Sequence, residues 1–223
     1  MADVTLPAVA APPNTARATY EEYLALPQAD RLIEWVNGEV IYHRPPLEIH
    51  QSLVGYLYHL LRSFVSFSNL GRVYVAPFEM KCRPEANSRE PDVLFVAQAN
   101  LGRIGEKRLE GPADLIVEVV SDDSVARDFD DKFIEYQECG VAEYWIVDPR
   151  PRRQRALFHQ RAADGLFELI APREGIYHSR AIPGFWLKTA WLWAMPDPLL
   201  TFAEIAGLSE STLAELQAKK ASA

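Results

Sequence analysis

The alternation of apolar and polar residues along the chain predicts a mixture of helices and strands. Between residues 47 and 68 apolar residues recur every three or four positions, which is the period of a long core helix. Shorter runs rich in β-branched and aromatic residues, each bounded by turn-forming residues, predict four strands. These strands cover residues 72–81, 91–97, 114–121 and 143–148.

The last two of these strands are separated by a segment with a helical pattern. Residues 128–139 form an amphipathic pattern that ends at Gly140, a residue suited to the left-handed conformation that closes a helix. A strand, a helix and a further strand in this order predict a β-helix-β crossover. The pattern as a whole predicts an α/β fold, in which a mixed central sheet of about four or five strands is flanked by helices.

Smaller elements are expected around this centre as peripheral β-hairpins and short helices. Asn37-Gly38 favours a tight turn, because both central residues of a type I′ turn take positive φ. We therefore predict a hairpin from residues 31–36 and 39–43. The other predicted elements are a helix over 20–26 with a capping box of Thr19 and Glu22, a hairpin of 154–160 and 166–170, short strands within 176–187, and a helix over 201–219.

Length and composition favour one compact domain with short additions at both ends. The chain has 223 residues, 48% of them hydrophobic, which suits a single core. We expect a disordered leader over 1–17, rich in Ala, Pro and Thr, a main domain over 18–193 and a C-terminal helical extension over 194–223. The leader lacks the apolar segment of a signal peptide, and no apolar run approaches the roughly 20 residues of a membrane span. We therefore expect a soluble, cytoplasmic protein.

Charge and cysteine content narrow the function classes further. A formal net charge of -8 argues against tight, nonspecific nucleic-acid binding by the whole surface, although it leaves room for a local basic cleft. Cys82 and Cys139 lie far apart in the sequence and match no zinc spacing. We expect two buried, unpaired cysteines in a reducing compartment, with neither a disulfide nor a metal site built from them.

One carboxylate stands out because it interrupts a run that is otherwise apolar. Glu118 lies in the middle of the strand predicted over 114–121, and an ionised carboxylate in such a place needs a partner, a proton or a metal ion. Asp92 opens the strand predicted over 91–97. Two carboxylates on neighbouring strands are ligands that a hard cation such as Mg²⁺ prefers.

A lysine completes a set of groups suited to phosphodiester hydrolysis. Lys132 and Tyr136 lie four residues apart on the helix that follows Glu118, and so share one face. Hydrolysis of a phosphodiester needs a cation that neutralises the scissile phosphate and lowers the pKa of a bound water, and a lysine near the nucleophile assists it. Asp92, Glu118 and Lys132 supply these parts.

These residues resemble the motif of the restriction-endonuclease-like PD-(D/E)XK superfamily, with one departure. Pro91-Asp92 matches the first half, whereas Val120 stands where the pattern Glu118-x-Lys expects lysine. The chain is similar in this respect to the Uma-type family of restriction endonucleases, in which a helical lysine, here Lys132, takes that place. The longer similarity comprises Glu118 to Ser121, Ser124, Asp128, Lys132, Tyr136, Gly140-Val141 and Glu143 to Pro149, with Asn37-Gly38-Glu39 and His50 earlier, and extends over about 19–191.

The resemblance implies a restriction-endonuclease-like fold and a metal-dependent endonuclease that acts on DNA. By that resemblance Asp92, Glu118 and the Val119 carbonyl would bind Mg²⁺ or Mn²⁺, Lys132 would orient or activate water, and Glu39 would approach the same metal. A homodimer is expected because two active sites are commonly needed to cut both strands.

Structural roles compete with each of these assignments. Glu118 would be inert if it only paired with Lys132 or Arg127, Lys132 if it only paired with Asp128, and Glu39 if it only faced solvent. His50 and Tyr136 would serve as packing groups, Ser121 and Ser124 as caps, and Trp145 as core. The basic run Arg150, Arg152, Arg153 and Arg155 would be a solvated turn, and Asp122, Asp123, Asp128, Asp130 and Asp131 would repel phosphate. The alternative functions are a catalytically inactive nuclease-fold module that binds nucleic acid or protein, and a hydrolase of another phosphate ester.

Overall fold

A six-stranded mixed sheet forms the centre of the computed structural model, which describes residues 15–26, 32–43, 47–122, 124–125 and 127–221. Its strand order is β12 (Phe167–Leu169), β11 (Arg155–Arg161), β10 (Glu143–Asp148), β9 (Leu115–Val119), β7 (Val93–Ala97) and β4 (Gly71–Val75). Within this sheet β9 and β10 are parallel, whereas the other neighbours are antiparallel. The predicted fold class is confirmed.

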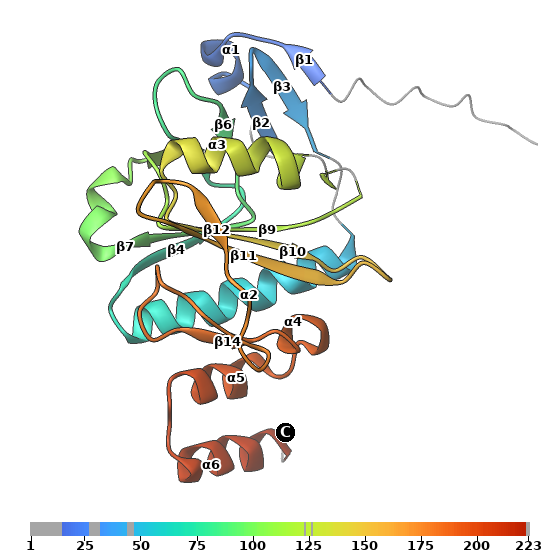
Figure 1. Cartoon of the computed structure of the whole chain (residues 1–223), viewed down its shortest axis with the longest axis vertical. Coiled ribbons are helices and arrows are strands. Elements are labelled where there is room, and N and C mark those ends of the chain that lie inside the picture. Colours follow the sequence, from blue (N-terminus) through green and yellow to red (C-terminus); the bar gives the residue numbers. More distant parts are fainter. Residues whose placement is uncertain (1–14, 27–31, 44–46, 123, 126, 222–223) are drawn as a thin grey trace, which may run out of the picture.

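Helices cover both faces of this sheet, as Figure 1 shows. Helix α2 (Glu48–Phe67) packs on one face, where it meets Val117, Val119 and Trp145 in the larger core. Helix α3 (Lys132–Cys139) lies on the other face over Ile116 and Tyr144, in the second core. A π-helical turn, η2 (Arg127–Asp131), leads into α3. Helix α3 ends at Gly140, which adopts a left-handed conformation with φ 95°. Because strand residues alternate between the faces, β9 contributes to both cores and carries Glu118 on the α3 side.

A second sheet lies beyond α3 (Figure 1). Its order is β1 (Thr15–Arg17), β3 (Glu39–Tyr42), β2 (Ile33–Val36), β6 (Ser88–Arg89), β5 (Glu79–Lys81) and β8 (Arg108–Glu110). The hairpin of β2 and β3 turns at Asn37 and Gly38, both of which have positive φ, so that prediction is confirmed. The predicted capping box is also present, at the start of α1 (Tyr20–Leu24). The 3-10 helix η1 (Gln98–Arg103) connects β7 to β8.

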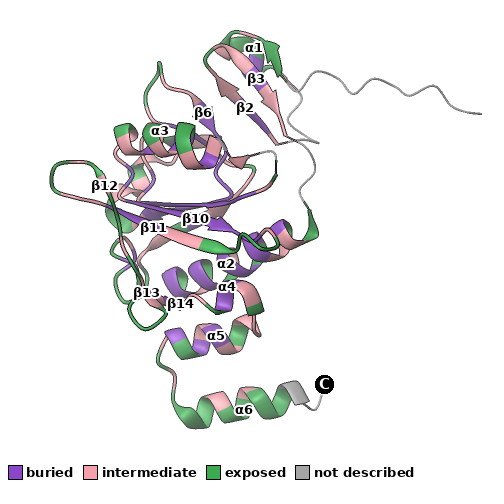
Figure 2. Cartoon of the chain, turned by 45° about the vertical axis from the view of Figure 1, so that its right-hand side comes forward, coloured by how far each residue is buried: buried purple, intermediate pink, exposed green. Residues whose placement is uncertain are grey.

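The C-terminal elements pack beyond α2. They are β13 (Ile176–His178), β14 (Trp186–Lys188), α4 (Trp191–Ala194), α5 (Pro198–Ile205) and α6 (Glu210–Ala221). Figure 2 shows that the central strands are buried, whereas most of α6 is exposed. Among the described residues, no helix is both long enough and apolar enough to cross a bilayer.

Three predicted boundaries are wrong. The strand predicted over 72–81 divides at Ala76-Pro77 into β4 and β5, which belong to different sheets, and proline cannot donate a ladder hydrogen bond there. The helix predicted over 201–219 is two helices, separated at Gly207, which has φ 65°. Thr15–Arg17, assigned to the leader, pair with β3 as strand β1. The rest of the predicted leader lies outside the described residues.

The two cysteines are paired, contrary to the sequence-based expectation. Cys82 and Cys139 form a disulfide with a Cα–Cα separation of 5.7 Å across 57 residues of sequence. The bond joins the chain just after β5 to the last residue of α3. Sequence spacing could not reveal this pairing, because the second sheet must first dock beside α3. The cysteine-based argument for a reducing compartment is therefore lost.

Candidate active site between the central sheet and helix α3

Two neighbouring strands bring Asp92 and Glu118 to the same edge of the central sheet. The antiparallel register of β7 and β9 pairs Val93 with Val117, so that Asp92 and Glu118 occupy the next opposing positions. Asp92 Oδ2 accepts a hydrogen bond of 2.7 Å from the Val119 amide, which continues the ladder with a side chain. Only 8% of Asp92 and 3% of Glu118 is exposed. The fold thus unites two carboxylates that are 26 positions apart in the sequence.

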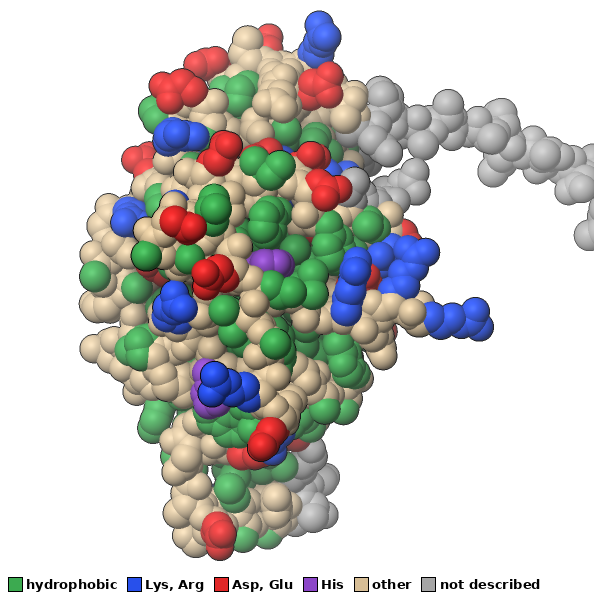
Figure 3. All heavy atoms as spheres, in the orientation of Figure 1, with side chains coloured by type: hydrophobic (Ala, Val, Ile, Leu, Met, Phe, Trp, Pro, Cys, Tyr) green, Lys and Arg blue, Asp and Glu red, His purple; other side chains and the backbone are tan. Residues whose placement is uncertain are grey.

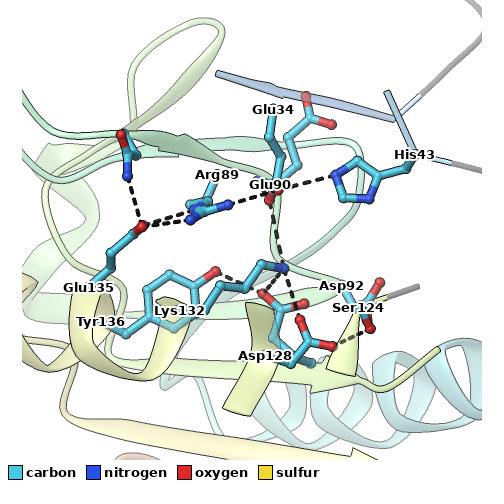
Figure 4. A network of polar contacts seen from close by, with 12 residues as sticks. Glu34, His43, Arg89, Glu90, Asp92, Ser124, Asp128, Lys132, Glu135 and Tyr136 are labelled. Atoms are coloured by element: carbon cyan, nitrogen blue, oxygen red, sulfur yellow. Dashed lines mark hydrogen bonds and ion pairs between the residues drawn. The ribbon is translucent and has the colours of Figure 1, made fainter. Parts of the chain in front are cut away.

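Lys132 enters this site from α3, in place of a lysine on the strand. Val120, at the position where the superfamily motif has lysine, packs in the apolar core under α3. The Lys132 Nζ atom lies 2.9 Å from Glu118 Oε1, 3.4 Å from Asp128 Oδ1 and 3.7 Å from Glu34 Oε1 (Figure 4). The structure therefore brings Asp92, Glu118 and Lys132 together, as the sequence analysis expected.

Hydroxyl groups hold the carboxylates beside Lys132 in place. The Tyr136 hydroxyl donates to Glu118 Oε1 over 2.8 Å, so this buried ring both packs and orients the carboxylate. Ser124 donates to Asp128 Oδ2, and the Tyr144 hydroxyl donates to the Asp128 backbone carbonyl over 2.8 Å. Ser124 Oγ also accepts from the Ser121 amide, which precedes it in the chain, so this bond closes the turn after β9 and is not a cap of the following helix.

Glu34 is a member of this cluster that the sequence analysis missed. It lies on β2 and has no exposed surface. Its Oε2 atom is 3.1 Å from Arg89 Nη1 and 3.1 Å from His43 Nε2, and its Oε1 accepts from the Glu90 amide. Figure 4 shows Glu34 above Lys132, where it joins the second sheet to α3. A charged residue within the short strand before Asn37-Gly38 was the available signal.

Glu39, which the resemblance suggested for the metal, has no such contacts. It begins β3, is only partly buried, and its side chain makes no hydrogen bond or ion pair with a described residue. Its Cα is paired with that of Val36, on the same face of the hairpin as Glu34. A role for Glu39 at the metal stays a prediction, and Glu34 is the hairpin carboxylate that reaches Lys132.

His50, near the start of α2, contacts the site from the opposite side. Its Nε2 lies 3.3 Å from Asp92 Oδ2. Burial alone would lower the pKa of His50, but the hydrogen bond and charge of Asp92 outweigh burial and raise it. His50 is therefore a hydrogen-bonding partner of Asp92 whose protonated form Asp92 favours, and it also faces the Val119 backbone.

The charges of the cluster do not cancel. Burial, with the nearby charges of Asp92 and Asp128, raises the pKa of Glu118 to about 8 although Lys132 opposes this shift. Burial alone would lower the pKa of Lys132, but Glu118, Glu34 and Asp128 raise it, so Lys132 stays charged. Burial would likewise raise the pKa of Glu34, yet Lys132 and Arg89 hold it well below its ordinary value. The neighbouring carboxylates and burial thus oppose the ionisation of Glu118 and Asp128, and full ionisation of Asp92, Glu118 and Asp128 would give an excess of negative charge that Lys132 alone does not neutralise.

This excess fits a divalent cation better than it fits a closed structural pair. No described residue donates a hydrogen bond to Asp92 Oδ1 or Glu118 Oε2, and Asp128 Oδ1 is buried without a hydrogen-bond partner. No group of three or more His, Cys, Asp or Glu side chains among the described residues is arranged to hold a metal. An ion there would need backbone, water or phosphate oxygens besides two carboxylates, an oxygen-rich set that suits Mg²⁺.

The remaining predicted residues lie around this centre. Trp145 is fully buried, as expected. Asp122 is exposed and forms an ion pair with Arg150, while Asp130 and Asp131 are exposed on η2. Asp123 lies outside the described residues. The alternative pairing of Lys132 with Asp128 is present together with the pairing to Glu118, so both carboxylates share one lysine.

A comparison with models of protein families identifies the family of this chain. The model of the Uma2 family, described as "Putative restriction endonuclease", matches residues 20–190. The chain belongs to this family. The match includes Glu34, Asp92, Glu118 and Lys132, and therefore the whole cluster. No curated protein matches the chain.

A solved structure confirms the fold of this Uma2-family chain. It is the crystal structure of "a putative nuclease belonging to DUF820 from Anabaena variabilis". The match has a TM-score of 0.63 and covers 78% of this chain and 96% of that one. With 16% sequence identity, the similarity shows a shared restriction-endonuclease-like fold.

Proposed function

We propose that this protein is a metal-dependent endonuclease that hydrolyses phosphodiester bonds of DNA. The observation that carries the proposal is the placement of Lys132 Nζ 2.9 Å from Glu118 Oε1, beside Asp92, which directly precedes the neighbouring strand β7. A carboxylate pair and an ammonium are thus assembled at one edge of the sheet although the strand lacks its lysine. Membership in a restriction-endonuclease family supports the same reaction class.

The chemistry requires a divalent cation, for which Mg²⁺ or Mn²⁺ is our proposal. Asp92, Glu118 and the Val119 carbonyl would hold it. When bound, such an ion neutralises charge on the scissile phosphate and lowers the pKa of water. The two carboxylate oxygens that accept no hydrogen bond from a described residue, Asp92 Oδ1 and Glu118 Oε2, are the donors that this role needs.

The protein's own groups prepare the site for an anionic substrate. Lys132 keeps its charge because carboxylates surround it, and would orient the attacking water while reducing repulsion of the phosphate. Tyr136 restricts where the Glu118 carboxylate lies, and Asp128 restricts where the Lys132 ammonium lies. Glu34 and Arg89 tie α3 to the second sheet, so these two are positioning residues.

Two further expectations accompany this proposal. A homodimer would place two such sites on the two strands of a duplex, which sedimentation at several protein concentrations would test. A cytoplasmic location, where DNA is accessible, is the expected place of action.

The deciding experiment measures cleavage of supercoiled plasmid DNA with Mn²⁺, Mg²⁺ or a chelator. We expect wild type to cleave only with metal. Glu118→Gln and Lys132→Met should lower the rate at least about 100-fold, because each removes charge stabilisation at the reacting phosphate. Asp131→Asn changes an exposed carboxylate on the neighbouring turn and serves as the matched control, with a rate near that of wild type.

Calorimetric titration with Mn²⁺ separates the proposal from the inactive module. Binding in wild type that disappears in Glu118→Gln supports a carboxylate metal site. Plasmid cleavage by Glu118→Gln at the wild-type rate would show that the proposed mechanism is wrong. Equal Mn²⁺ titrations for both proteins, with no cleavage of DNA, RNA or small phosphodiesters, would favour the inactive binding module. Cleavage of a small phosphodiester but not of DNA would favour a hydrolase that acts on another phosphate ester.

A further inference from the structure

Four arginines lie where β10 passes into β11: Arg150, Arg152 and Arg153 in the short turn, and Arg155 as the first residue of β11. The backbone of the turn is held by a hydrogen bond of 3.0 Å from the Arg153 amide to the Arg150 carbonyl. Arg152 adopts φ 64°, a left-handed conformation that reverses the chain direction. The arginines are therefore displayed on an ordered turn at the end of two central strands.

Two of these arginines anchor the turn to a buried carboxylate. Asp148, the last residue of β10, is fully buried and accepts hydrogen bonds from Arg150 Nε and Nη2 over 2.8 and 2.9 Å. Arg155 Nε lies 3.8 Å from the same carboxylate. One buried aspartate thus holds both sides of the turn.

The other two arginines have a different environment. Arg152 and Arg153 are exposed, and neither forms an ion pair with a described residue. The turn therefore has two positive charges that no described acid neutralises. In a chain with a net charge of -8, this is an unusual concentration of positive charge. Figure 3 shows Lys and Arg side chains gathered at the right-hand edge, where Figure 1 places this connection.

The anchors of the turn also lie against the segment that builds the active site. Arg150 Nη1 is 3.3 Å from Asp122 Oδ1, just after β9, and this pairing neutralises an exposed acid near the site. The Arg155 guanidinium lies 4.2 Å from the centre of the Phe129 ring, on the turn that carries Asp128. Because β9 and β10 are parallel, their C-terminal ends meet at one edge, so Glu118 and the arginines approach the same side of the molecule.

We propose that this arginine turn contacts the phosphate backbone of a DNA duplex and holds it against the site at Asp92 and Glu118. The inference rests on the proposed nuclease function and identifies the surface that would bind its substrate. Guanidinium groups suit phosphate because their planar donors form paired hydrogen bonds with two oxygens. A local contact of this kind is needed, since the acidic protein as a whole repels a polyanion.

The test measures binding of a short, mixed-sequence, fluorescent DNA duplex by anisotropy in EDTA, where no cleavage occurs. Arg152→Ser combined with Arg153→Ser is compared with wild type over a range of salt concentrations. We expect weaker binding for every sequence used, and a slope of log affinity against log salt that is smaller by about 2, because two phosphate contacts are lost. In the cleavage assay the same variant should have a raised KM and little change in kcat.

The matched control is Lys107→Ser combined with Arg173→Ser, which removes the same charge from two exposed residues on other connections. The control should retain both the affinity and the salt slope of wild type. Unfolding curves of both double variants should coincide with that of wild type, since none of the four side chains is buried. Equal loss of affinity in both variants would reduce the effect to net charge and overturn the inference, as would a wild-type protein that binds no duplex.

The two proposals fail in different ways. Duplex binding that depends on Arg152 and Arg153, without cleavage of any DNA, would support the binding surface and count against the nuclease. Cleavage that depends on Glu118 but proceeds with the same KM in the Arg152 and Arg153 variant would support the nuclease and overturn the binding surface.

Discussion

Two buried glutamates on adjacent strands of the central sheet differ in their hydrogen-bond partners and in the charges around them. Glu143 on β10 faces α2 and has no exposed surface. It accepts hydrogen bonds from Trp145 Nε1 and the Tyr177 hydroxyl, over 2.6 and 2.7 Å, and from the Ser179 hydroxyl and the amides of Arg180 and Ala181. Glu118 on β9 faces α3, and accepts a hydrogen bond only from Tyr136 among the described residues, beside a charged lysine and other carboxylates.

The difference shows how burial alone fails to identify a functional carboxylate. Glu143 has five neutral donors that satisfy both of its oxygens, so it holds the β13–β14 region to the sheet and leaves nothing to bind another ligand. Glu118 lies among like charges, with one oxygen that accepts no hydrogen bond from a described residue. A protein retains such an arrangement at a cost in stability, which is typical of groups that act on a substrate or metal.

The comparison predicts the largest loss of stability for Glu143→Ala. Removal of the acceptor leaves five donors without their partner in a buried place, and we expect the free energy of unfolding to fall by about 3–5 kcal/mol. Urea denaturation measures this change. Glu168→Ala, at an exposed glutamate paired across from Gln160 on the neighbouring strand, should change stability by less than about 0.5 kcal/mol. Similar values for the two variants would contradict the structural role of Glu143.

A smaller loss of stability is expected for Glu34→Gln. Its two cationic partners keep a second ion pair, Arg89 with Glu135 and Lys132 with Glu118. We expect about 2–3 kcal/mol at neutral pH. Since the folded protein holds the pKa of Glu34 well below 4.5, its contribution is present above that pH and disappears as the pH falls further. Urea denaturation at several pH values should therefore show the two proteins converging in acid. A constant difference between them would contradict the ionised state of Glu34.

Glu90 should show the reverse sign. Burial and the charge of Glu34 raise the pKa of Glu90 to about 8, and its Oε2 atom is buried without a hydrogen-bond partner. The unfolded chain loses this proton near pH 4.5, so stability that is present below that pH falls as the pH rises towards 8. Glu90→Gln should thus raise the free energy of unfolding by about 1–2 kcal/mol near pH 9 and change it little near pH 4. Urea denaturation of Glu90→Gln and wild type at these two pH values provides the measurement. A variant that is less stable than wild type near pH 9 would contradict the prediction.

The smallest effect on stability is expected for Glu118→Gln. Lys132 keeps Asp128 and Glu34 as partners, and the amide oxygen can still accept from Tyr136. We expect a change of less than about 1 kcal/mol, because removal of one acid also relieves repulsion among the others. Thermal and urea unfolding measure it. A loss as large as that of Glu143→Ala would place Glu118 in the same structural class and remove the contrast between the two sites.

Much of the fold could be predicted because local patterns agree with the final structure. The period of α2, the turn at Asn37-Gly38 and the closure at Gly140 each depend on a few adjacent residues. The division of the strand at Ala76-Pro77 was missed although Pro77 was a signal for it, because the residues on its two sides do not show that they join different sheets. The disulfide of Cys82 and Cys139 was missed for the same reason.

The residues of the candidate site likewise fall into those that the sequence could place and those that only the packed structure could place. The sequence by itself determined that Glu118 lies within a strand, that Asp92 stands at the start of another and that Lys132 follows on a helix, because hydrophobic periodicity locates the elements along the chain. Only the tertiary structure decided that Glu34 and Arg89 join them from a second sheet and that Glu143 is satisfied by neutral donors. It also decided that Glu39 has no hydrogen bond or ion pair with a described residue of the cluster. The physical reason is that a side chain's charge state and partners depend on elements that meet only after the two sheets and α3 have packed together.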